Sequence, residues 1–218
     1  MLLPTSGYSQ AEIQRRQDLI GSWLPADFAI ELVGSPQSPE FLDEAHHFDD
    51  AVAEAGAFLG SLTPDRFAVV IEGGALDPGL DKARAASPMP VVGPGEASMY
   101  VASILNRPTS IITVDEHAVA AAERMLTIRP VAPPIASIRS IETPVREVMK
   151  DFSRAEARIQ QSAKRAIADD GAEAIFLGAM ILGMLPASDT FRAQLGVPVF
   201  NPVRIAVATA VQLAQSNA

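Results

Sequence analysis

Six short apolar runs, separated by segments with helical patterning, constrain the fold more than any other feature of the sequence. The runs are FAIELV, FAVVI, PVVG, TSIITV, AIFLG and VPVFN, at residues 28–33, 67–71, 90–93, 109–114, 174–178 and 197–201. They lack a polar alternate face, which is typical of strands buried on both sides in a parallel sheet. Because parallel strands need crossover connections, the alternation of runs and helical segments predicts an α/β fold.

Three segments carry residues that commonly begin a helix, a hydroxyl or amide cap followed by glutamate or proline. They are Ser9 with Glu12, Ser153 with Glu156, and Asn201 with Pro202. The first two pairs have the spacing of a capping box, and the third places proline at the first helical position. Helices are therefore expected between the strands.

The chain also contains an internal resemblance between residues 68–97 and residues 174–206. Each segment has a buried strand, a turn of small residues, a short helix, a proline-valine strand, and then a glycine or asparagine and a proline before another helix. Two similar units place two small-residue strand ends in related positions. Ligands of open α/β sheets bind beyond the carboxyl ends of strands, so two such ends facing each other would form a cleft.

Composition restricts the partners and the chemistry. The 218 residues include 26 acidic and 17 basic ones, and the net charge of −9 disfavours nucleic acid and an anionic membrane as partners. There is no cysteine, which excludes disulfides, thiolate metal ligands and thiol catalysis by this chain. The first residues do not resemble a signal peptide, and the longest apolar stretch, 174–187, is shorter than the roughly 20 residues of a membrane span. We expect a cytoplasmic enzyme or binding protein.

Five longer motifs follow one another along the chain. They are DPGLDKAR, PVVGPGEASMYVAS, SIITVDEHAVAAAERM, RAIADDGAEAIFLGA and LGVPVFNPVRIAVATAVQLA. From about residue 30 onward the chain resembles the aspartate/glutamate/hydantoin racemase superfamily, most closely its hydantoin and allantoin racemase branch. The resemblance implies two similar α/β domains with parallel-type sheets, related by pseudo-twofold symmetry, with the active-site cleft between them. The first domain is expected to comprise residues 1–95 plus 198–218 and the second residues 96–197, in a homo-oligomer.

The resemblance also implies a mechanism without a cofactor. Two cysteines, one in each repeat, face each other; one thiolate removes the proton next to a carbonyl, and the other thiol delivers a proton to the opposite face. Backbone N–H groups and small hydroxyl side chains hold the carboxylate or ring carbonyls of the substrate. We therefore expect no cofactor and no metal, and a small carboxylate or cyclic amide as the bound partner.

The chain departs from this pattern where the thiols belong. Counting back from Asp77 places Gly74 at the first cysteine position, and counting on from Gly178 places Ala179 at the second. Three explanations remain open. Ala179 is an engineered replacement for a natural cysteine; or the protein is naturally thiol-free and performs related isomerisation, decarboxylation or lyase chemistry with another base; or it has lost catalysis and binds a small acid.

Two side chains are candidates for the catalytic acid or base. Glu72 lies two positions before Gly74 at the end of a strand, and a carboxylate against an apolar wall can have its pKa raised towards neutrality. The alternative is that Glu72 pairs with an arginine or caps the following turn. His117 lies where the helix after Thr113 should start. It could polarise a carbonyl as a neutral imidazole, or be a surface histidine of the first helical turn.

Small polar groups near the two strand ends are expected to bind the substrate. Ser98 and Thr113 supply hydroxyls, and Ala75 and Met180 supply backbone amides, although each could equally be a cap or turn residue. The sequence, with the resemblance, predicts a cofactor-independent racemase or isomerase acting at an acidic carbon next to a carbonyl. The alternatives are a decarboxylase or lyase with one non-thiol base, and an inactive form that binds a small acid.

Overall fold

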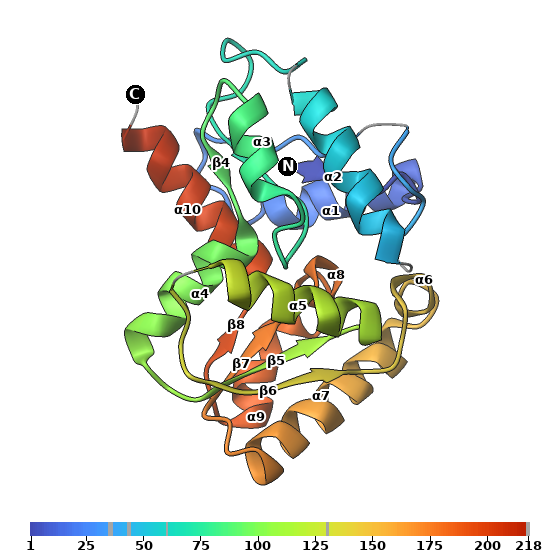
Figure 1. The fold of residues 1–218 in the computed structure, drawn as a ribbon, viewed down its shortest axis with the longest axis vertical. Coiled ribbons are helices and arrows are strands. Elements are labelled where there is room, and N and C mark those ends of the chain that lie inside the picture. Colours follow the sequence, from blue (N-terminus) through green and yellow to red (C-terminus); the bar gives the residue numbers. More distant parts are fainter. Residues whose placement is uncertain (35–36, 43–44, 60, 130, 217–218) are drawn as a thin grey trace. The chain divides into compact units, whose positions relative to one another are not determined.

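The chain divides into two compact units (Figure 1). The structure is a computed structural model that describes residues 1–34, 37–42, 45–59, 61–129 and 131–216. Unit 1 comprises Met1–Pro94 together with Val203–Ala218, and unit 2 comprises Gly95–Pro202. Unit 2 is thus one continuous segment, whereas unit 1 is built from two.

Unit 1 contains short parallel strands and the helices that connect them. The elements are β1 (Leu2–Leu3), α1 (Gln10–Gly21), β2 (Val33–Gly34), α2 (Ala45–Leu59), β3 (Val70–Ile71), α3 (Leu80–Ala86), β4 (Val91–Val92) and, after unit 2, α10 (Pro202–Ser216). Strand β1 pairs with β2, and β3 pairs with β4. A parallel bridge between Leu2 and Glu72 joins the two pairs, so the order is β2-β1-β3-β4.

Unit 2 contains longer strands in one parallel sheet. Its elements are α4 (Pro94–Leu105), β5 (Thr109–Thr113), α5 (Glu116–Ile128), β6 (Ile135–Ser140), α6 (Val145–Val148), α7 (Phe152–Asp169), β7 (Ala174–Leu177), α8 (Met180–Gly183), a 3-10 helix (Ser188–Thr190), α9 (Phe191–Leu195) and β8 (Val199–Phe200). The order across the sheet is β6-β5-β7-β8. Helices α5 and α7 both contact β5 and β6.

The two units share one strand topology. In each, the strand that comes first in the chain lies between the second and the third, and the fourth lies beyond the third. The connections contain helices, as parallel neighbours require. The expected α/β class, with two similar domains on parallel sheets, is confirmed.

The core of unit 2 consists of apolar side chains from its central strands and from the helix that covers them. Every residue of β7 is completely buried, and so are Ile111 and Ile112 of β5. Helix α7 covers the sheet with Ala155, Ile159 and Ala163, which are four residues apart and therefore share one helical face. The alanines are small enough to let the helix backbone approach the sheet closely.

The helix starts agree only in part with expectation. The Ser9 hydroxyl accepts from the Glu12 N–H at 3.2 Å, which confirms that cap, and α10 begins at Pro202 as expected. The expected cap at Ser153 is wrong, because Asp151 Oδ1 accepts from the Arg154 N–H at 2.9 Å and begins α7 two residues earlier.

The strands also differ from expectation at particular places. Within the FAIELV run only Val33 lies in a strand. Strand β6 was not expected, because its sequence IASIRS is half-buried along its whole length at the edge of the sheet and lacks the continuous apolar run of a central strand. Unit 2 continues to Pro202 instead of ending at residue 197, because β8 pairs with β7 through Ile175 and Val199.

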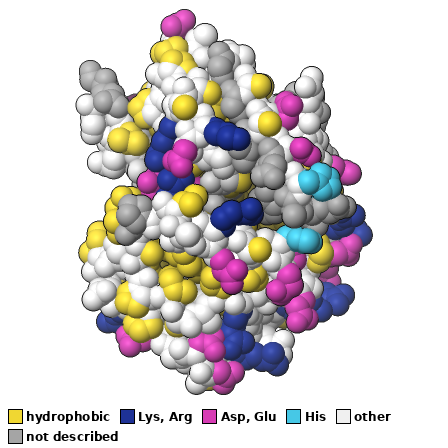
Figure 2. Space-filling model, in the orientation of Figure 1, with side chains coloured by type: hydrophobic (Ala, Val, Ile, Leu, Met, Phe, Trp, Pro, Cys, Tyr) yellow, Lys and Arg dark blue, Asp and Glu magenta, His cyan; other side chains and the backbone are white. Residues whose placement is uncertain are grey.

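The surface shows how the charged residues are distributed. On the face in Figure 2, acidic and basic side chains are interspersed rather than gathered into one basic area. None of the helices in the described part of the chain has the length and hydrophobicity needed to cross a bilayer.

Candidate functional site

In unit 1 the candidate site is the carboxyl end of β3, where Glu72 follows the strand. The Glu72 N–H donates to the Val92 carbonyl at 2.9 Å, which continues the pairing with β4. Its side chain turns back, and Oε2 accepts a hydrogen bond from the Gly74 N–H at 2.9 Å. The carboxyl therefore caps the turn that follows β3, which was one of the two roles considered for it.

The environment of Glu72 favours its protonated form. The residue is only 1% exposed. Burial, followed by the negative charge of Asp77, raises the pKa of Glu72 well above its usual value of 4.5, and the hydrogen bond from Gly74 opposes this shift. A neutral carboxylic acid can donate a proton and later recover it, which is the property that acid–base catalysis requires.

Gly74 lies where the resemblance places the first thiol, and the structure explains why it is glycine. A Cβ atom on Gly74 would lie 3.1 Å from Glu72 Oε2 and 2.6 Å from Pro78 Cγ. The second distance is too short for any side chain unless the turn moves. The Glu72 carboxyl thus stands directly beside the position that a thiol-bearing residue would occupy.

The turn after Gly74 brings a second carboxyl to this strand end. Asp77 is 3% exposed and has a positive φ of 54°, which the turn stabilises with a hydrogen bond from the Asp77 N–H to the Gly74 carbonyl at 3.1 Å. Ala75, an expected amide donor, is buried in the same turn. Sequence reasoning used Asp77 only to count positions and missed its electrostatic effect on Glu72.

In unit 2 the equivalent point is the carboxyl end of β7. The Gly178 N–H donates to the Ile112 carbonyl at 2.7 Å, and the Thr113 hydroxyl donates to the Gly178 carbonyl at 3.1 Å. The Thr113 hydroxyl thus donates its hydrogen bond to the protein backbone in this structure. Ala179 follows in extended conformation and precedes the four-residue helix α8, whose first residue, Met180, is 7% exposed.

The two strand ends are built alike. Gly73 and Gly178 both lie where the neighbouring strand leaves no room for a side chain: a Cβ on Gly73 would overlap the Leu2 carbonyl, and one on Gly178 would lie 2.8 Å from an Ile111 methyl. The residues that follow these glycines are Gly74 and Ala179. They therefore occupy equivalent positions in the two units, and neither carries an ionisable group.

Of the two remaining expected residues, one is exposed and the other is buried. His117 is exposed in the first turn of α5, whose cap is Asp115 Oδ1 accepting from the Ala118 N–H at 2.9 Å. Ser98 is completely buried in α4. Unit 1 thus brings Glu72, Gly74 and Ala75 together, and unit 2 brings together Thr113, Ala179 and Met180.

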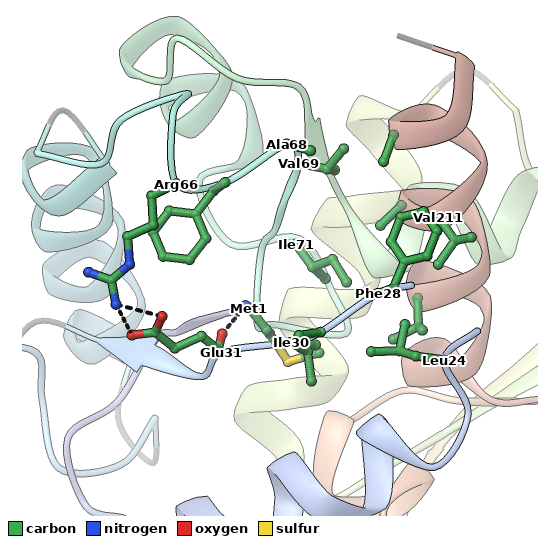
Figure 3. A pocket seen from close by; sticks show the side chains of 15 residues that line it. Met1, Leu24, Phe28, Ile30, Glu31, Arg66, Ala68, Val69, Ile71 and Val211 are labelled. Carbon is green, nitrogen blue, oxygen red and sulfur yellow. Dashed lines mark hydrogen bonds and ion pairs between the residues drawn. The ribbon is translucent and has the colours of Figure 1, made fainter. Parts of the chain in front are cut away.

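A separate cavity of about 140 Å³ lies elsewhere in unit 1 (Figure 3). Apolar side chains such as Phe28 and Val211 line it, and the Arg66–Glu31 ion pair, at 2.7 Å, lies on one side. Its lining includes residues that precede β1, β2 and β3, so it adjoins the amino ends of these strands rather than the end that carries Glu72. Among the described residues, no group of three or more His, Cys, Asp or Glu side chains is arranged to hold a metal ion.

Comparison with known proteins places this chain in a family. Residues 11–210 match the family described as Asp/Glu/Hydantoin racemase. The hydantoin racemase of Pseudomonas sp. (strain NS671) is 35% identical over 127 residues, which cover 58% of this chain and 50% of that protein. The chain therefore spans about half the length of this relative.

Solved structures of similar fold agree with the match. Allantoin racemase from Klebsiella pneumoniae has a TM-score of 0.85 at 21% identity, over 99% of this chain and 86% of that one. Allantoin racemase from Pseudomonas fluorescens has a TM-score of 0.82 at 25% identity, over 99% of this chain and 90% of that one. The fold and the match over nearly the whole chain lead to one conclusion: this protein belongs to the Asp/Glu/hydantoin racemase family.

Proposed function

We propose that this protein is a cofactor-independent enzyme of the racemase and isomerase kind. It transfers a proton at an acidic carbon next to a carbonyl, in a small carboxylate or a hydantoin-like cyclic amide. Membership of the family supports the class of reaction, and the names of its relatives, hydantoin racemase and allantoin racemase, support the class of substrate.

The observation that carries the proposal is the position of the Glu72 carboxyl beside Gly74. A Cβ at position 74 would be 3.1 Å from Glu72 Oε2, so this oxygen lies next to the place where a thiol would be attached. Burial and the charge of Asp77 raise its pKa, which favours the protonated form that can donate a proton. Glu72 is thus proposed to replace the first thiol as the acid–base group.

A one-sided reaction is the second candidate, and a specific feature of unit 2 favours it. Racemisation by two bases needs an acid–base group on each face of the substrate carbon, but Gly178, Ala179 and Met180 offer none. In a decarboxylation, the bond between the substrate carbon and its carboxylate breaks, carbon dioxide leaves, and the electron pair remains as an enolate. One proton from Glu72 to that carbon completes the reaction, and solvent returns a proton to Glu72.

The proposal is tested by proton NMR in deuterated water. The unaltered protein, Glu72→Gln and the control Asp81→Asn are mixed with 5-substituted hydantoins, allantoin, amino dicarboxylates and substituted malonates. Asp81 is an exposed acid in the first turn of α3, in the same unit as Glu72. We expect C–H exchange or product formation with the unaltered protein and Asp81→Asn, and a loss of at least about 100-fold in Glu72→Gln, the lower range for a positioned acid–base group.

Other outcomes would contradict the proposal. Equal rates in Glu72→Gln and the unaltered protein would show that Glu72 is not the acid–base group. Exchange or turnover that appears only in Ala179→Cys would show that the reaction requires a thiol. Binding of an acid without exchange or turnover by any variant would leave a small-acid-binding protein.

We further propose that the protein assembles as a homo-oligomer. Helix α4 exposes the large apolar side chains of Tyr100, Val101, Ile104 and Leu105, of which Ile104 is 81% exposed. Such a group is more common at protein contacts than on an isolated surface. Light scattering coupled to gel filtration should show a larger mass for the unaltered protein than for Ile104→Lys, and a monomeric mass for both would refute the assembly.

A further inference from the structure

Arg16 is an arginine in the interior of unit 1 whose hydrogen-bonding capacity is not filled. It lies on α1, is 1% exposed, and donates from Nε to Glu12 Oε1 at 2.7 Å. Its Nη2 is buried and has no hydrogen-bond partner among the described residues. A buried donor without a partner is costly, and more so when it carries charge, so a side chain of this kind calls for an acceptor.

Glu12 does not supply that acceptor, because its carboxylate is shared between two arginines. Arg15 donates from Nε to Glu12 Oε2 at 2.8 Å and from Nη2 to Oε1 at 2.7 Å, the oxygen that Arg16 also uses. Burial alone would raise the pKa of Glu12, but the hydrogen bonds from Arg15 and Arg16 lower it below its usual value. The single ionised carboxylate thus leaves Nη2 of Arg16 open.

The guanidinium of Arg16 lies near the carboxyl ends of the strands, where ligands of α/β proteins bind. Its Cζ is 3.8 Å from the centre of the Tyr8 ring, and Tyr8 belongs to the connection between β1 and α1. The side chain therefore runs back towards the N-terminal end of α1, as helical side chains do. That connection leaves the carboxyl end of β1, the strand bridged to Glu72.

The same connection contains a second donor without a partner. Thr5 is 5% exposed, and its hydroxyl oxygen is buried with no hydrogen-bond partner among the described residues. The residue after it is held in place, because the Ser6 N–H donates to the Pro39 carbonyl at 2.9 Å and the Ser6 hydroxyl to the Ser38 carbonyl at 2.8 Å. A fixed segment with an open hydroxyl and an open guanidinium N–H suits an oxyanion.

We propose that Arg16 binds the carboxylate of a small organic acid near the carboxyl ends of the strands of unit 1. The proposal rests on the proposed function only in taking that acid to be the substrate. It narrows the substrate class, because a charged guanidinium favours a carboxylate over a neutral cyclic amide of the same size.

The test measures binding rather than turnover. Isothermal titration compares phenylmalonate, which is anionic, with 5-phenylhydantoin and with inorganic phosphate. The variants are Arg16→Gln, Arg16→Lys and the matched control Arg15→Gln, which removes the other guanidinium from the same glutamate. We expect Arg16→Gln to weaken phenylmalonate binding by roughly 10- to 100-fold, the range for a charged hydrogen bond, and Arg15→Gln to change it by less than about 3-fold.

The outcomes separate this proposal from the proposed function. Equal losses in the Arg15 and Arg16 variants, no binding of phenylmalonate, or Arg16-dependent binding of phosphate alone would overturn it. If Arg16→Gln does not fold, Arg16→Lys decides, since a retained charge without the guanidinium should still weaken binding; unchanged affinity in Arg16→Lys would overturn the proposal. Binding that depends on Arg16 but is not accompanied by proton exchange would support this inference and contradict the proposed enzyme activity. Proton exchange that does not depend on Arg16 would support the enzyme activity and contradict this inference.

Discussion

Glu72→Gln should change how the stability of unit 1 depends on pH. Glutamine is a neutral isostere of protonated glutamate and can still accept the Gly74 hydrogen bond. The pKa of Glu72 is raised in the folded state, so between about pH 4.3, where an unfolded glutamate titrates, and the folded pKa, the folded state keeps a proton that the unfolded state has lost. Stability contributed by this group is present below that window and is lost as pH rises through it.

The size of the effect follows from the linkage relation. One group that is protonated in the folded state and ionised in the unfolded state costs up to about 1.4 kcal/mol per pH unit. The stability of the unaltered protein should therefore fall, relative to Glu72→Gln, by up to this amount for each pH unit inside the window.

The assay is urea unfolding followed by tryptophan fluorescence at several pH values. The chain has one tryptophan, Trp23, which lies in unit 1 with the Arg204 guanidinium 4.1 Å from its ring, so the signal reports on the unit that contains Glu72. Asp81→Asn is the control and should follow the unaltered protein. An identical pH dependence in Glu72→Gln would show that Glu72 is ionised when folded, and would remove the basis for its role as a proton donor.

Two further changes test the local structure. Gly74→Ala should lower the free energy of unfolding by about 1–3 kcal/mol, because the added Cβ meets the Pro78 ring. Gly21→Ala is the control and should not lower it, because a Cβ there meets nothing within 4 Å. Equal effects in the fluorescence assay would mean that the turn moves to accommodate the methyl group. Asp151→Ala should lower unfolding stability by about 1 kcal/mol through loss of the α7 cap, with Ser153→Ala near neutral, and the reverse order in urea titrations followed by circular dichroism would contradict the cap assignment.

The parts of the fold that the sequence predicts are those whose burial leaves a pattern. Strand β7 is buried on both faces, and its run AIFL is continuously apolar. Strand β6 is half-buried at the sheet edge, so its six residues show no continuous apolar run, and β1 has only two residues, too few for any pattern. The α7 cap was misplaced because Asp151 and Ser153 are both capping residues, and the choice depends on how the chain leaves α6.

The candidate site was predictable in position but not in chemistry. The internal repeat predicted two small-residue strand ends, and counting along the family motifs placed Gly74 and Ala179 at them. The return of the Glu72 carboxyl to the Gly74 N–H depends on the backbone of the turn, which a two-residue alternation does not describe. Arg16 was missed because a single arginine on the buried side of the polar segment QAEIQRRQDLIG interrupts no pattern.

The discontinuous make-up of unit 1 has a consequence for synthesis. Helix α10 supplies Val207 and Val211 to the interior of unit 1, yet the ribosome makes it only after residues 95–202 of unit 2 have been added. Domains that are continuous in the chain can fold as they emerge. Unit 2 is synthesised completely before unit 1 is, whereas unit 1, although it is begun first, has part of its apolar interior uncovered until α10 is made.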